Sequence, residues 1–152
     1  MNNENNIDII VRKAVQIYSE DTLVKKLKSG KKLSAKELDF LRRTDPILYA
    51  HALRVQRMAE ALKQQLSHAK SKQEANDMIT SAIAGVSDKD PDKEYLLAAY
   101  NEVSKNFHKS PAYQRLPNTP EDAKKRKTNN ITNPHRRVKQ NKQQILDVTN
   151  KI

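Results

Sequence analysis

The apolar residues between positions 48 and 69 constrain the fold of this chain more than any other feature. They advance in alternating steps of four and three residues, as along one face of a helix that packs on another; they are Leu48, Ala52, Val55, Ala59, Leu62, Leu66 and Ala69. The preceding Asp45 and Pro46 are typical of a helix N-cap and first helical position. The spacing predicts one long helix, about 32 Å from Leu48 to Ala69 at 1.5 Å per residue.

This seam fits either the core of a small helical bundle or the interface of a homodimer. Three of its seven positions are Ala, which suits close packing within one chain better than a self-standing dimeric coiled coil. We therefore expect an internal core, and a monomer and a homodimer both remain compatible with the sequence.

Helical spacing also dominates the sequence on both sides of the seam. No alternating β-branched run bounded by turn residues suggests a strand. Capping residues and glycines mark further helices, over about 7–18, 19–30, 34–44, 71–85 and 90–107. We predict an all-α protein, a helical bundle of about six helices with one long central helix, formed by residues 6–110.

Residues 111–152 differ in composition from this predicted bundle. Three prolines interrupt the pattern between residues 111 and 120, and the sequence beyond is polar and strongly charged, as in disordered segments. We expect a disordered basic tail there. Four aliphatic residues close to its end form a short apolar motif that could fold back on the helices or enter a partner's groove; they are Ile145, Leu146, Val148 and Ile152.

Composition argues against several classes of enzyme. The chain has two glycines and no cysteine, so Gly-rich phosphate loops, thiolate catalysis and Cys-based metal sites are not expected. None of the four histidines has a neighbour at metal-ligand spacing; they are His51, His68, His108 and His135. We expect no catalytic residues, no metal site and no cofactor, and the protein is not expected to be an enzyme.

The N-terminal residues lack the basic start and long apolar run of a signal peptide. No run approaches the roughly 18 apolar residues of a membrane span. We expect a cytoplasmic protein that does not enter a membrane.

Basic residues are concentrated in two stretches, within a formal net charge of +11. Such runs neutralise phosphates and release counterions, which gives affinity without sequence readout. Lysines near a helix end can instead complement the helix dipole and keep the surface soluble. The candidate nucleic-acid-binding residues are Lys25, Lys26, Lys28, Lys31 and Lys32 in the first stretch, and Lys124, Lys125, Arg126, Lys127, Arg136, Arg137 and Lys139 in the tail.

Two features limit what these cations can recognise. The last aromatic residue is Tyr113, so the tail itself offers no ring for base stacking. A helix-turn-helix over residues 19–44 is disfavoured, because Glu37 and Asp39 would lie on the recognition helix and the turn exceeds the usual 3–4 residues. Binding through these residues would depend on salt more than on base sequence.

These observations favour a non-enzymatic helical binding protein that contacts nucleic acid, or another polyanion, non-specifically through its basic C-terminal tail. The alternative is a helical adaptor or assembly component. It would dock a protein partner, such as an acidic protein surface, through its helices and through the motif of Ile145, Leu146, Val148 and Ile152.

Overall fold

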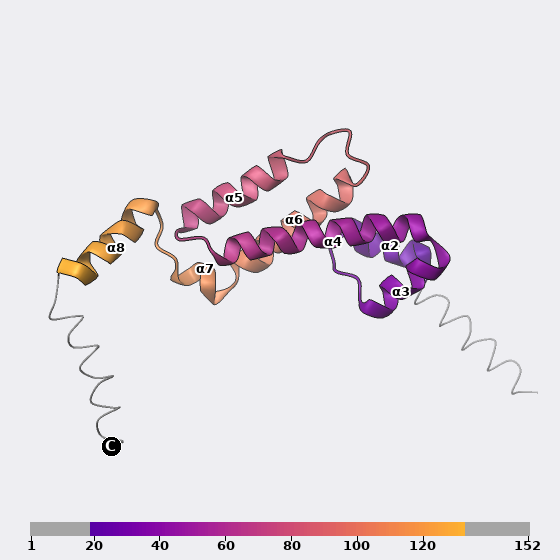
Figure 1. The fold of residues 1–152 in the computed structure, drawn as a ribbon, viewed down its shortest axis with the longest axis horizontal. Helices are drawn as coiled ribbons and strands as arrows, with labels where there is room; N and C mark the ends of the chain where they lie inside the picture. Colours follow the sequence, from indigo (N-terminus) through magenta and orange to yellow (C-terminus); the bar gives the residue numbers. More distant parts are fainter. Residues whose placement is uncertain (1–18, 133–152) are drawn as a thin grey trace, which may run out of the picture.

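The computed structural model describes residues 19–132 of the chain, and their side chains as far as residue 129. Within these residues it consists of helices and connecting segments without a strand (Figure 1). The helices are α2 (Glu20–Lys28), α3 (Ala35–Thr44), α4 (Pro46–Ser67), α5 (Lys72–Ala84), α6 (Lys93–His108), α7 (Pro111–Arg115) and α8 (Pro120–Thr132). The prediction of an all-α bundle around one long helix is confirmed. The helix expected over 7–18 lies outside the described residues.

The helix starts follow the capping residues that the sequence offers. The Ser34 hydroxyl accepts a hydrogen bond from the Glu37 backbone N–H, and the Glu37 carboxylate accepts one from the Ser34 N–H, a complete capping box for α3. The Asp45 carboxylate accepts from the Leu48 N–H, and Pro46 is the first residue of α4. These local interactions satisfy N–H groups that have no partner within their helices.

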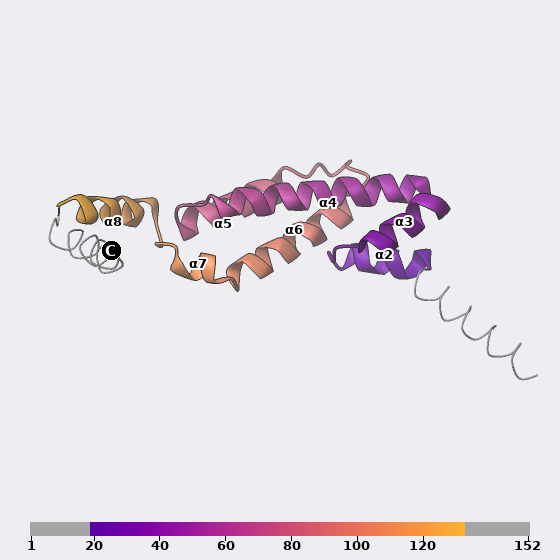
Figure 2. The same cartoon turned by 60° about the horizontal axis from the view of Figure 1, so that its bottom comes forward.

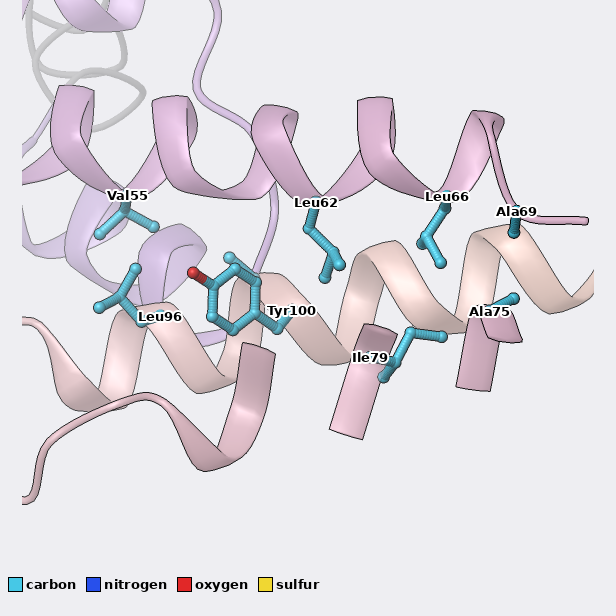
Figure 3. Close-up of a cluster of buried hydrophobic side chains, with 9 residues drawn as sticks. Val55, Leu62, Leu66, Ala69, Ala75, Ile79, Leu96 and Tyr100 are labelled. Atoms are coloured by element: carbon cyan, nitrogen blue, oxygen red, sulfur yellow. The ribbon is translucent and has the colours of Figure 1, made fainter. Parts of the chain in front are cut away.

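The main core lies where α4 packs against α6 and α5. Figure 3 shows Val55, Leu62 and Leu66 projecting from α4 toward Leu96 and Tyr100 of α6, with side chains of α5 completing the layer. Five of the seven seam positions are buried, and Leu48 and Ala59 are half-buried. The seam is therefore an internal core, as expected.

A second cluster covers the N-terminal half of α4. It joins Leu23 and Leu27 of α2, Leu33 of the α2–α3 turn and Leu41 of α3 to Ala52 of α4. In both Figures 1 and 2, α2 and α3 lie at one end of the elongated molecule and α8 lies at the other. The half-buried Tyr95 of α6 packs against both clusters and connects them.

Residues 111–132 depart from the tail that we expected, because they contain two helices. Ser110 caps α7 and Pro111 is its first residue, while the Thr119 hydroxyl accepts a hydrogen bond from the Asp122 N–H at the start of α8. Prolines that interrupt a helical pattern also suit the first position of a new helix. Three of the six prolines thus mark helix starts, at positions 46, 111 and 120.

The segment between α7 and α8 is attached to the bundle. Leu116 packs against the main core cluster. The first N–H groups of α5, from Lys72 and Gln73, donate to the carbonyl oxygens of Pro117 and Asn118 at 2.8 and 3.1 Å. These bonds satisfy two helix N-terminal donors that water would otherwise solvate, and they hold the start of α8 beside the start of α5.

The two glycines give a test of the turn that seats α2 on α6. Gly30 has φ +79°, and a Cβ there would overlap the Ala98 carbonyl oxygen of α6. We expect Gly30→Ala to lower the free energy of unfolding by about 2 kcal/mol or more, from left-handed strain and the clash. Urea unfolding measures this change.

Gly85→Ala is the matched control, since Gly85 has φ −74° and ends α5 in a helical conformation. Its expected change is within about 0.5 kcal/mol. Equal losses in the two variants would contradict the close approach of Gly30 to α6.

Candidate polyanion-binding surface

Several carboxylates of the bundle are paired with cations of the bundle itself. Lys26 lies 2.9 Å from Glu37, Arg42 and Arg43 flank Asp39 at 2.8 and 3.2 Å, and Lys93 lies 2.7 Å from Asp88. The exposed pairs of Asp39 and Asp88 contribute little stability. They do reduce the negative charge that would repel an acidic partner.

Glu37 is nearly buried at the contact between α2 and α3. Burial alone would raise the pKa of its carboxyl group. The hydrogen bonds from the Ser34 backbone N–H and from Lys26 outweigh burial, so the pKa is lowered and the carboxylate stays charged. Lys26 is consequently engaged within the fold, and it is a weaker candidate for phosphate contact than its neighbours.

A network of polar and charged groups links α4 to the start of α6. Arg54 contacts Asp90 through Nη2 and Asp92 through Nη1, both at 2.7 Å, and His51 Nδ1 lies 2.7 Å from the other Asp92 oxygen. Asp92 is 2% exposed. Buried carboxylates require partners of this kind, and the network thereby positions the N-terminus of α6 on α4.

The helix that we expected over about 90–107 begins later than predicted. α6 begins at Lys93, and Asp92 occupies the cap position without a side-chain capping bond. The Asp92 carboxylate is directed to Arg54 and His51 instead, and Asp90 accepts a hydrogen bond from the Asp92 N–H. Sequence spacing gave no sign of this, because Arg54 and Asp90 lie on different elements.

The cations of α8 lack such partners. Lys124, Lys125, Arg126 and Lys127 are all exposed, and no carboxylate of a described residue lies within ion-pair distance of them. Successive helical residues are about 100° apart, so these four charges surround the helix. The Arg126 guanidinium also donates to the Arg115 carbonyl oxygen at 3.2 Å, which ties α8 to α7.

A polar pocket of about 430 Å³ lies where α5, α7 and α8 meet. Three cations line it, Lys72 from α5 and Lys125 and Arg126 from α8, against a single carboxylate, that of Asp122. The amides of Gln114, Asn118 and Asn129 complete its polar lining. Cations and amide donors around an open pocket match the oxygen atoms of a phosphate or carboxylate group.

Aromatic rings adjoin the Lys72 side of this pocket. The Lys72 ammonium lies 5.3 Å from the centre of the Tyr113 ring, which packs edge-on against Phe107 and His108. His108 Nε2 is 2.7 Å from Asn76 Oδ1. Our sequence reasoning missed Lys72 and treated Tyr113 as outside the basic region; their proximity depends on α7 folding back against α5.

The structure separates the two basic stretches. Lys25, Lys28, Lys31 and Lys32 are exposed at the end of α2 and in the following turn. Figures 1 and 2 place α2 and α3 at the end of the molecule opposite α8. Arg136, Arg137, Lys139, His135, Ile145, Leu146, Val148 and Ile152 lie outside the described residues.

Other kinds of site find no support within residues 19–132. No group of three or more His, Cys, Asp or Glu side chains there is arranged to hold a metal ion. None of these helices combines the length and apolar composition needed to cross a membrane. Comparison of the chain with protein-family models, curated proteins and solved structures finds no significant match.

The Arg54 network predicts a specific pH dependence of stability. The hydrogen bonds from Arg54, followed by that from the Asp92 N–H, lower the pKa of Asp90. The stabilisation that results is present above the ordinary carboxyl pKa of about 4 and is lost as the pH falls through the lowered value. We expect Arg54→Gln to be less stable than wild type near pH 6, with the difference narrowing below about pH 4.

Urea midpoints measured across this pH range test the expectation. Arg57→Gln is the control, because Arg57 is exposed one turn further along α4 and pairs with no carboxylate of the described residues. A stability difference for Arg54→Gln that does not change with pH would show that charge pairing is not its source.

Proposed function

We propose that this chain is a non-enzymatic helical protein that binds a polyanion, most simply nucleic acid, through α8 and the pocket at its base. The observation that carries the proposal is the set of four exposed cations on α8 without carboxylate partners among the described residues. Lys26, Arg54 and Lys93 of the bundle are paired internally, and the exposed lysines at the end of α2 lie at the opposite end of the molecule.

The attachment of α8 supports this role. Cations on a helix that is anchored near its start, through the Pro117 and Asn118 carbonyl groups, lose less freedom on binding than cations on an unattached chain. Lys72 extends the charge onto the bundle, and the half-buried Tyr113 ring beside it supplies an aromatic group near the phosphate-binding surface. Contact would be mainly to phosphates, with little sequence preference.

The first experiment removes the α8 charges together, as Lys124, Lys125, Arg126 and Lys127 each changed to Gln. Binding to a short mixed-sequence duplex is measured across salt concentrations by fluorescence anisotropy. The slope of the logarithm of the binding constant against the logarithm of the salt concentration is about −0.9 per phosphate contact. We therefore expect its magnitude to fall by about 3 to 4 in this variant. Far-UV circular dichroism checks that the helices persist.

The matched control removes the same charge from the opposite end of the molecule. It changes Lys25, Lys28, Lys31 and Lys32 to Gln, which are exposed as the α8 cations are. We expect this variant to retain most of the salt slope. Equal losses would indicate a response to net charge alone, and no loss in either would favour the helical adaptor, with the cations facing a protein partner.

A single substitution tests the pocket itself. Lys72→Gln removes the cation that α5 contributes, so we expect the slope to fall by about 1. Lys70→Gln, two residues away and outside the pocket, should leave the slope unchanged. The same loss in both variants would show that the pocket has no special part in binding.

A further inference from the structure

An apolar groove on the bundle shares no lining residue with the basic pocket. It has a volume of about 540 Å³ between α4 and α5, with Tyr100 of α6 among its lining residues. Its apolar lining consists of Met58, Ala61, Leu62, Met78, Ala82 and Tyr100. Methionines adapt their shape to an inserted side chain, and small alanines leave room for one, so the groove suits the apolar face of a short helix.

The rim of this groove is acidic. Glu74 and Asp77 line it from α5, and neither pairs with a cation of a described residue. An occupant that carries apolar anchors beside basic residues would match both the floor and the rim.

We propose that residues 145–152 of the same chain occupy this groove. Their sequence places Ile145, Val148 and Ile152 at positions i, i+3 and i+7, the spacing by which a helix presents anchors to a groove. The connecting residues 133–144 contain Arg136, Arg137, Lys139 and Lys142 and no acidic residue. These cations would lie near the acidic side chains at the rim of the groove.

The length of the connecting segment is sufficient. α8 starts beside the first turn of α5, and its 13 residues extend about 20 Å. The groove residues of α5 lie within about 15 Å of that first turn. Twelve extended residues, 133–144, span up to roughly 40 Å, so residue 145 can return from the end of α8 to the groove.

Paramagnetic relaxation tests this placement in the full chain. The protein has no cysteine, so Ser81→Cys on the groove accepts a nitroxide label at one site. We expect the amide NMR signals of residues 145–152 to be lost by broadening with this label. A label at Ile47→Cys, exposed near the start of α4 and about 17 to 27 Å along that helix from the groove residues Met58 to Gln65, should broaden them far less.

A matched pair of substitutions on α4 tests whether the groove causes the effect. Ala61→Arg fills it from an exposed position, and we expect the broadening from the Ser81 label to disappear. Ala50→Arg is an equally exposed change three turns away on the same helix face, and it should preserve the broadening.

A mixture of isotope-labelled protein with spin-labelled, isotope-free protein shows whether residues 145–152 occupy the groove of their own chain or that of a second copy. No broadening is expected in the mixture. Broadening that is equally strong there would assign the groove to a second copy, and absence of broadening in the singly labelled chain would leave residues 145–152 outside the groove. Either result overturns the proposal, and neither depends on whether α8 binds nucleic acid.

Discussion

The packing of α4 on α6 is the constraint on which the rest of the structure depends. α4 provides residues to both apolar clusters, Ala52 to one and Val55, Leu62 and Leu66 to the other. α6 faces α4 through Leu96, Ala99 and Tyr100, while its backbone receives the Gly30 turn that seats α2. Since burial of apolar area is the main stabilising term in folding, the small helices owe their positions to this pair.

Charge is distributed according to the same architecture. Where elements of the bundle meet, a cation and a carboxylate neutralise each other, as Arg54 does with Asp90 and Asp92, and Lys26 with Glu37. A buried carboxylate such as Asp92 cannot remain unpaired without a large desolvation cost. α8 packs outside these contacts, so its cations are under no such requirement. The result is a scaffold that pairs charges where its helices meet and leaves the cations of α8 exposed at one end.

The basic pocket depends on backbone interactions more than on side chains. The carbonyl groups of Pro117 and Asn118 bind the first N–H groups of α5, and Leu116 anchors the preceding residues in the core. These contacts bring Lys72 next to Lys125 and Arg126, although they are far apart in the sequence. The first N–H groups of α5 are thereby used to position the side chains of the pocket.

The sequence by itself determined helices α2 to α6, most of their caps and the seam, because these depend on neighbours within about one turn, as the capping box of Ser34 and Glu37 illustrates. It also indicated Lys124–Lys127 as a basic cluster. It did not indicate α7 and α8, whose prolines resembled breaks in a pattern, nor the Arg54 network, the Lys72 pocket or the α4–α5 groove. Those features join residues distant in sequence, and their geometry is decided by how the helices pack, which apolar periodicity leaves undetermined.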